Sequence, residues 1–385
     1  MQRHLLLDLL SLALLALIVV GFFGPLVFAG YWIPHGGGDL VSFLWPMYRF
    51  SARSLQRGEV PLWNPHLYSG APFVADNQSG VFYPINLLAF ALFGEPSYKV
   101  MEGLVVFHIW LAGINTFALL RGLGLKRPAA VFGGAAFALS DLFVTHIGNL
   151  NLNATVAWMP LLLLFTHRAL ARKGRRAATY AMGAGAVLAT AALAGHGQML
   201  LVTGLALAGT ILYKLATDVG AISNRADTIR AYVLKWLRAA LIVLIGISGA
   251  ALALLPAREM TEHTGRSRLP YEEATVYSLP PQALTGLLAP DFYGRSATGF
   301  WGDWDRVEVG YAGVATVVLA TAGVILACTS WAAKSKVLGS RFQVPQTCNL
   351  EPANLQPCFP MGFFVLLTTY RSSTPRHQSR GIAGR

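Results

Sequence analysis

Eight apolar runs recur along the chain, separated by segments that are polar or rich in glycine and proline. They lie at 9–29, 100–120, 129–147, 154–170, 179–194, 197–214, 238–256 and 309–331. Because the hydrocarbon core of a bilayer needs roughly 20 apolar residues per helix, this pattern predicts an all-α, polytopic bundle of about eight transmembrane helices. The runs at 129–147 and 179–194 are short, so their ends are the least well defined.

Composition agrees with a membrane protein. Hydrophobic residues make up 54% and charged residues 12% of the 385 positions, whereas a soluble domain carries about 25% charged residues. The net charge is +12, but the basic residues cluster in short segments between apolar runs, which argues against nucleic-acid binding. The three cysteines all lie near the C-terminus, so neither a disulfide framework in the outer loops nor a zinc site is expected.

Lysine and arginine are concentrated in alternate loops. The basic loops hold Arg121, Lys126 and Arg127; Arg168, Arg172, Lys173, Arg175 and Arg176; and Lys214, Arg225, Arg230, Lys235 and Arg238. By the positive-inside rule, these loops and the N-terminus are cytoplasmic, and the long loops 30–99 and 257–308 are outside. The first run is too long for a typical signal peptide, so we interpret it as the uncleaved first helix of a multi-pass plasma-membrane protein.

The first outer loop, 30–99, is expected to contain two interface helices. One spans 40–57, where an apolar face that includes Trp45 and Tyr48 opposes a row of arginines, and Gly58 ends it. The other spans 84–93, and turns are expected between the two helices. Residues 1–333 are predicted to form the transmembrane domain, and 334–385 a mostly disordered, aberrant tail, because the apolar run in that tail is too short to cross a bilayer.

The same loop holds a dense series of short motifs. They read Gly38-Asp39-Leu40, Pro61-Leu62-Trp63-Asn64-Pro65, Ser69-Gly70-Ala71-Pro72-Phe73, Asp76-Asn77-Gln78-Ser79-Gly80 and Phe82-Tyr83-Pro84-Ile85-Asn86-Leu87-Leu88. Turn-forming residues alternate here with aromatic and carboxamide side chains. Such a loop can build a rigid pocket beside the membrane.

These motifs resemble the first outer loop of the YfhO family of bacterial membrane proteins. Further matches are Gly195-His196-Gly197-Gln198 and Leu288-Ala289-Pro290-Asp291-Phe292-Tyr293-Gly294. The resemblance covers about residues 5–330, the N-terminal half of a typical member, so a truncated and inactive product is one expectation. It implies a fold similar to that of GT-C glycosyltransferases, which take sugars from polyprenyl-phosphate donors and transfer them outside the membrane.

By this resemblance, Asp39 is the catalytic or metal-binding residue, since GT-C enzymes carry an acidic residue early in the first outer loop. The preceding glycines, Gly36, Gly37 and Gly38, leave the backbone free to approach a substrate. A carboxylate at the membrane surface can act as a general base toward an acceptor hydroxyl, or hold Mg²⁺ or Mn²⁺ against a phosphate. The alternative is that Asp39 is only the N-cap of the interface helix.

Six other residues are candidates for substrate binding: Asp76, Asn77, Gln78, His196, Arg266 and Arg268. The first three could bind sugar hydroxyls, although an Asx-turn explains them equally well. His196 stands at the outer end of a predicted transmembrane helix, where it could mark a functional cavity or simply bond a helix-end carbonyl. The two arginines could bind a lipid phosphate, lipid head groups or neighbouring glutamates.

A further polar group lies between two predicted transmembrane helices on the same outer side: His146, Asn149, Asn151 and Asn153. These side chains could help to line the donor or acceptor pocket. We interpret them instead as a solvated turn, because polar residues between two apolar runs usually face water.

The sequence therefore predicts a membrane glycosyltransferase-like protein that moves a sugar from a lipid-linked polyprenyl-phosphate donor to a cell-envelope glycan or lipid acceptor. The alternatives are a transporter or flippase of a lipid-linked substrate, and a non-catalytic membrane assembly partner. Broken helices or an inverted repeat would favour a transporter. The sequence contains no Walker loop, dinucleotide fingerprint, HExxH or GxSxG motif, which argues against ATP-driven transport.

Overall fold

The computed structural model describes residues 2–33, 39–219 and 226–275, and further along 278, 280–289, 292–294, 301, 317–318, 321–325 and 329. The described residues are mostly helical, with 77% in helices and 1% in strands. It forms two compact units, Met1–Arg268 and Leu269–Arg385. The predicted domain boundary at residue 333 and the tail beyond it lie outside the described residues.

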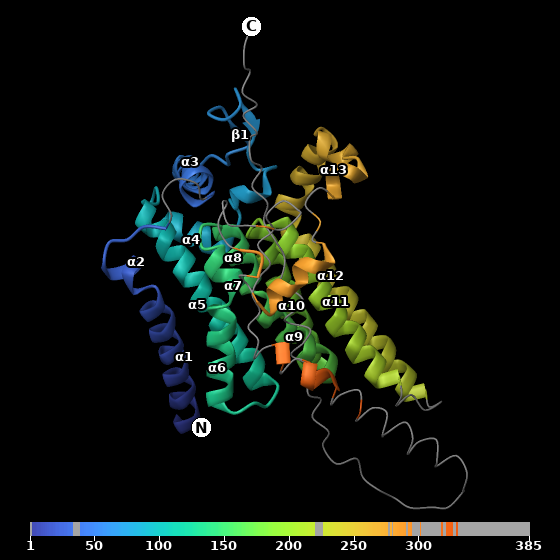
Figure 1. The fold of residues 1–385 in the computed structure, drawn as a ribbon. Coiled ribbons are helices and arrows are strands. Elements are labelled where there is room, and N and C mark those ends of the chain that lie inside the picture. The colour runs from blue at the N-terminus through green and yellow to red at the C-terminus, as the bar shows by residue number, and fades with distance from the viewer. Residues whose placement is uncertain are drawn as a thin grey trace, which may run out of the picture. The chain divides into compact units, whose positions relative to one another are not determined.

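The first unit is a helical bundle with short elements at one end (Figure 1). The long bundle helices are α1 (Gln2–Phe22), α5 (Tyr98–Gly122), α6 (Arg127–Ala138), α9 (Met159–Ala171), α10 (Gly174–Leu193), α11 (Gly197–Val219) and α12 (Ala226–Glu262). The shorter elements are α2 (Gly24–Phe28), η1 (Leu40–Leu44), α3 (Trp45–Gln56), β1 (Trp63–Asn64), β2 (Ala71–Pro72), η2 (Asn77–Ser79), α4 (Pro84–Phe93), α7 (Asp141–Thr145), α8 (Leu150–Ala157) and η3 (Gly265–Arg268).

Six helical segments in the described residues are long and apolar enough to cross a membrane. They are His4–Phe22, Tyr98–Gly122, Arg127–Thr145, Leu150–Ala171, Gly197–Thr217 and Ile229–Glu262. The predicted run at 179–194 is helical as α10 but is not among the six, and most of the run at 309–331 lies outside the described residues. A helical membrane protein is therefore supported, but the predicted count of eight is not established.

Two of these segments are broken helices. In the first, Leu139 and Ser140 separate α6 from α7, and in the second the single residue Trp158, whose backbone stays in the αR region, separates α8 from α9. Pro160 stands in the first turn of α9, where proline is tolerated because its missing N–H needs no partner. At this break, Nδ2 of Asn115 in α5 donates to the carbonyl of Ala157 at 2.8 Å, so a buried side chain satisfies a backbone group.

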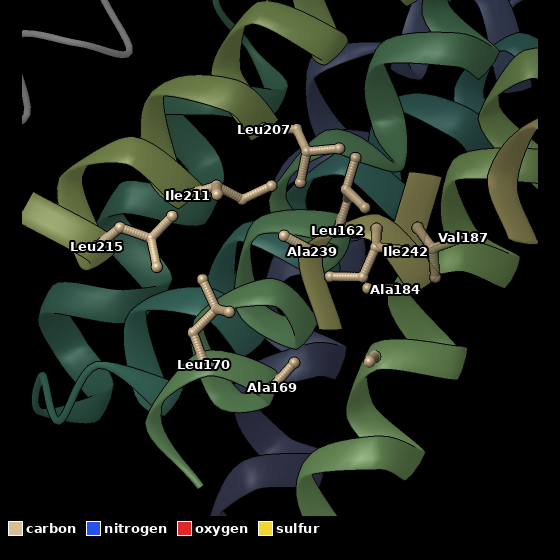
Figure 2. Close-up of a cluster of buried hydrophobic side chains, with 11 residues drawn as sticks. Leu162, Ala169, Leu170, Ala184, Val187, Leu207, Ile211, Leu215, Ala239 and Ile242 are labelled. Atoms are coloured by element: carbon tan, nitrogen blue, oxygen red, sulfur yellow. The ribbon is translucent and has the colours of Figure 1, made fainter. Parts of the chain in front are cut away.

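Small and branched side chains pack α9, α10, α11 and α12 together (Figure 2). The buried cluster consists of Leu162, Ala169, Leu170, Ala181, Ala184, Val187, Leu207, Ile211, Leu215, Ala239 and Ile242. Gly185 of α10 lies so close to α12 that an added Cβ would stand 2.6 Å from Cβ of Ile245. Small residues at such contacts let helices approach closely in lipid.

The two predicted interface helices are present. A π-helical turn, η1, leads into α3, which buries Met47 and Tyr48 and exposes Arg49 and Arg53. The predicted stop, Gly58, has a φ of +77°, a conformation that glycine adopts without strain. Helix α4 spans Pro84–Phe93, as predicted, and the turns between the helices include one short antiparallel pair, β1 with β2.

An ion-pair cluster joins the helices of this loop. Glu95, just beyond α4, accepts from Arg49 at 2.9 Å and from Arg53 at 2.8 Å. The hydrogen bonds from Arg53 and Arg49 lower the pKa of the Glu95 carboxyl to about 2. These contacts fix the polar face of α3 relative to the end of α4.

The second unit contains α13 (Tyr271–Thr275) and η4 (Pro281–Leu287) among its described residues. Phe292, Tyr293 and Trp301 form an aromatic cluster, with ring centroids 4.8–5.6 Å apart. Phe292 and Tyr293 belong to the motif at 288–294. Pro290 and Asp291 of the same motif lie outside the described residues.

Candidate functional site

Asp39 lies immediately before η1, which leads directly into α3 among the short elements of the first unit. Asp39 stands at the N-cap position of η1, as the alternative expected, but its side chain makes no capping hydrogen bond. Instead, one carboxylate oxygen accepts from Nδ2 of Asn149 at 3.3 Å. The side chain is half-buried, and desolvation by burial raises the pKa of the Asp39 carboxyl above its ordinary value.

Asn149 connects Asp39 to helix α8. Its Oδ1 accepts from the backbone N–H of Leu152, so Asn149 caps α8 and offers its amide hydrogens to Asp39. The capping bond fixes which end of the carboxamide faces the acid. Asp39 is therefore held by a neutral donor rather than by a cation.

The three asparagines around the start of α8 are buried, so their interpretation as a solvated turn is wrong. Asn151 and Asn153 are 0% exposed, and Asn149 is 9% exposed. Asn151 accepts from the hydroxyl of Tyr48 at 2.9 Å and donates to the carbonyl of Gln78 at 2.6 Å. One side chain of α8 thus ties together α3 and the loop that contains η2.

Asp76 forms an Asx-turn, the alternative that the sequence left open. Its Oδ1 accepts from the backbone N–H of Gln78 at 2.9 Å and begins η2. Asn77 and Gln78 are half-buried, and Oδ1 of Asn77 is enclosed without a hydrogen-bond partner. The turn geometry accounts for Asp76, whereas the orphaned oxygen of Asn77 leaves an acceptor that a ligand hydroxyl could satisfy.

The Gly195-His196 motif lies directly against this loop. Gly195 has a φ of +90°, and a Cβ there would collide with the carbonyl oxygen of Asn77. His196 is 8% exposed, and its Nδ1 accepts from the backbone N–H of Met199 at 3.2 Å. His196 therefore caps α11 by accepting from a backbone N–H. The alternative, in which the ring bonds a helix-end carbonyl, is wrong for Nδ1.

Burial also sets the protonation state of His196. Desolvation, with a smaller repulsion from His146, lowers the pKa of the His196 imidazole to about 4. At neutral pH the ring is therefore uncharged, with Nδ1 engaged as an acceptor and the proton on Nε2. His196 therefore adds no charge to the site at neutral pH.

A buried hydrogen-bond network beneath the site was not predicted from the sequence. The hydroxyl of Tyr83 accepts from Nε1 of Trp158 at 2.8 Å and lies 2.8 Å from Nε2 of His108. His108 donates through Nδ1 to the carbonyl of Leu104, which leaves Nε2 to accept from Tyr83. The network links the loop, α5 and the α8–α9 break, and only the chain's tertiary contacts reveal it.

The structure shows no contact between the two predicted arginines, Arg266 and Arg268, and the residues around Asp39 in the part of the chain that it describes. Arg268 is exposed at the end of η3, and the side chain of Arg266 lies outside the described residues. Neither residue has a described contact with Asp39 or with its neighbours. Their predicted role in phosphate binding stays a prediction.

The divalent cation expected at Asp39 stays a prediction. No group of three His, Cys, Asp or Glu side chains that could hold a metal ion occurs in the described part of the chain. Asn149 turns its amide hydrogens toward Asp39, whereas a Mg²⁺ or Mn²⁺ ion requires oxygen donors. The contact with Asn149 leaves the other carboxylate oxygen of Asp39 to accept a proton.

Comparisons with protein families, with curated proteins and with solved structures give no match for this chain.

Proposed function

We propose that this chain is a membrane glycosyltransferase that uses Asp39 as its general base. The observation that carries the proposal is the half-buried, uncapped carboxylate of Asp39 beside Asn149, with its pKa raised by desolvation. A raised pKa makes a carboxylate a stronger base while it stays ionised near neutral pH. Burial of a charge without a cationic partner is costly, and such strained ionisable groups cluster at functional sites.

In the proposed reaction, the donor is a sugar carried on a polyprenyl phosphate, and the acceptor is a hydroxyl of a cell-envelope glycan or lipid. The acceptor oxygen attacks the anomeric carbon of the sugar, and the bond from that carbon to the phosphate oxygen breaks. Asp39 takes the proton of the acceptor hydroxyl, and polyprenyl phosphate leaves with the bonding electron pair. Asn149 holds the carboxylate oriented, and Asn77 and His196 offer an acceptor and a donor to sugar hydroxyls.

Asp39→Asn tests this proposal in cells that lack the protein. Cell-envelope glycans are compared after complementation with wild type, Asp39→Asn and Glu59→Gln, each checked for equal abundance in the membrane. Glu59 is the matched control, because it is an exposed acid of the same loop. We expect Glu59→Gln to restore the glycan and Asp39→Asn to restore less than about 1% of it, since a positioned base contributes 10²–10⁴-fold. Full restoration by Asp39→Asn would remove this residue from the mechanism.

A transporter or flippase of the same lipid-linked substrate is the second candidate, and the two broken helices favour it. Transporter binding sites are built at interrupted helices, and the α8–α9 break lies close to the Tyr83 network. The leaflet in which the unconsumed donor accumulates separates the two functions. Loss of a transferase leaves the donor on the outer leaflet, where a membrane-impermeant oxidant reaches its sugar, whereas loss of a flippase leaves it protected.

A further inference from the structure

Two basic turns lie at the same end of the first unit. One joins α5 to α6 and the other joins α9 to α10, and the ends of α5 and α9 are in contact. A Cβ added to Gly122, the last residue of α5, would stand 3.3 Å from Nη2 of Arg168 in α9. Because the two turns lie next to each other, the ways in which their positive charges are compensated can be compared.

The α5–α6 turn carries its own counter-charge. Asp8 of α1 accepts from Nε of Arg127 at 2.7 Å and lies 3.8 Å from Nε of Arg121. The carboxylate thus compensates the basic residues of this turn within the chain. Asp8 therefore offsets part of the positive charge of this turn, in which the exposed Lys126 adds a third basic residue.

The α9–α10 turn has no such compensation among the described residues. Its four basic side chains are exposed, and no described acidic side chain forms an ion pair with them: Arg172, Lys173, Arg175 and Arg176. Helix α10 has no acidic residue in its first turn, so the positive end of its dipole adds to the repulsion. Arg238 of α12 brings one more cation, since its Nη1 donates to the carbonyl of Arg172 at 3.1 Å.

We propose that this basic patch, Arg172, Lys173, Arg175 and Arg176, binds the head groups of anionic phospholipids. The patch lies at the end of the candidate transmembrane segment Leu150–Ala171, the position at which a spanning helix reaches the head groups. Four cations within five residues concentrate positive charge, and such charge attracts an anionic surface over about one Debye length, roughly 10 Å at 0.1 M salt. Anionic lipid supplies the counter-charge that Asp8 supplies to the other turn.

Thermal unfolding of the purified full-length chain in neutral detergent tests the proposal. Phosphatidylglycerol is added in one arm, phosphatidylcholine in a second and soluble glycerol phosphate in a third. We expect phosphatidylglycerol alone to raise the unfolding temperature of the wild type, and the rise to shrink as salt increases. Equal stabilisation by phosphatidylcholine, or by glycerol phosphate, overturns the assignment to an anionic lipid surface.

Two matched double variants test whether the residues of the basic patch bind the phosphatidylglycerol. Arg175→Gln/Arg176→Gln removes two charges from the patch, and Arg57→Gln/Arg258→Gln removes two exposed charges that lie outside both basic turns. We expect the first to weaken phosphatidylglycerol binding at least about tenfold, and the second to leave it within about twofold of wild type. An equal loss in both variants would attribute binding to net charge and overturn the proposal. Unfolding temperatures measured without lipid show whether each variant is folded.

Discussion

At the scale of single residues, the site combines groups that stabilise the fold with one group that does not. Asp76, Asn149 and His196 each accept from a backbone N–H at the start of a helical segment, so each has a structural role. Asp39 occupies a similar position but makes no such bond, and its charge is partly desolvated. This contrast distinguishes it from the other polar residues of the site.

Replacing Asp39 by asparagine should leave the protein at least as stable as wild type at neutral pH. The folded state raises the pKa of this carboxyl above its ordinary value of 3.8, so the ionised form costs stability as pH rises above that value. Asparagine has the same shape, can still accept from Asn149 and cannot ionise. Thermal unfolding in detergent at pH 7 measures the effect, and a clear decrease in the unfolding temperature would assign Asp39 a structural role.

Substitutions of His196 should separate its capping role from a binding role. His196→Ala should cost about 1 kcal/mol at pH 7 through loss of the α11 cap, whereas His196→Asn should retain most of that stability, because asparagine is a good N-cap. Thermal unfolding measures both variants. If His196→Asn is stable but fails to restore the glycan, the ring has a role in the reaction beyond capping.

Replacing His196 should also change how strongly the stability of the protein decreases as pH falls. Its pKa is about 4 when folded and near 6.5 when unfolded, so the stability that depends on the neutral ring is lost as pH falls from about 6.5 through 4. His196→Asn does not titrate in this range. Unfolding measured between pH 7 and pH 4 should therefore show a smaller decrease for His196→Asn than for wild type, and identical decreases would contradict the burial of a neutral ring.

At the scale of elements, the sequence predicted the helix ends that proline and glycine mark. It did not predict the helix interruptions or the buried asparagines, because tertiary contacts determine these. Helix α4 and the end of α3 were predicted because Pro84 and Gly58 mark them. The breaks at Leu139–Ser140 and Trp158 fall inside apolar runs, where hydropathy gives no signal. The asparagines of α8 were misassigned to a solvated turn, because sequence position alone cannot show that α3 and the η2 loop cover them.

Gly195→Ala should disrupt the contact between the α10–α11 turn and the η2 loop. The backbone there has a positive φ, and the new methyl group would clash with the carbonyl of Asn77. We expect a loss of about 1–3 kcal/mol, comparable to other strained backbone positions. Gly197→Ala is the matched control, because nothing lies within 4 Å of its added Cβ. Equal unfolding temperatures for the two variants would show that the two segments do not pack as described.

At the scale of the whole molecule, the central expectation is that the Asp39 site and the basic turns lie on opposite sides of a membrane. Each candidate transmembrane segment of the first unit runs between the end with the short elements and the end with the basic turns (Figure 1). By the positive-inside rule, we expect the site to lie outside the cytoplasm. A sugar donor on the outer leaflet could reach Asp39 without crossing the protein.

Cysteine accessibility tests this orientation. Ser69 and Ala178 are both exposed, on the site loop and near the start of α10 respectively, whereas the neighbouring Ala177 is 0% exposed and unsuitable as a reporter. After replacement of the three native cysteines, an impermeant thiol reagent added to intact cells should label Ser69→Cys and not Ala178→Cys. The opposite labelling would invert the orientation and exclude transfer on the outer side.

The most direct test of glycosyl transfer uses the purified protein and the lipids of cells that lack it, because those lipids retain the unconsumed donor. Wild type and Asp39→Asn are incubated with this extract and with the envelope acceptor, and lipid-linked sugars are followed by mass spectrometry. The account predicts that wild type converts one polyprenyl-phosphate sugar to polyprenyl phosphate with matching gain of the sugar by the acceptor, and that Asp39→Asn does not. An unchanged donor pool with wild type, or equal conversion by both proteins, would contradict it.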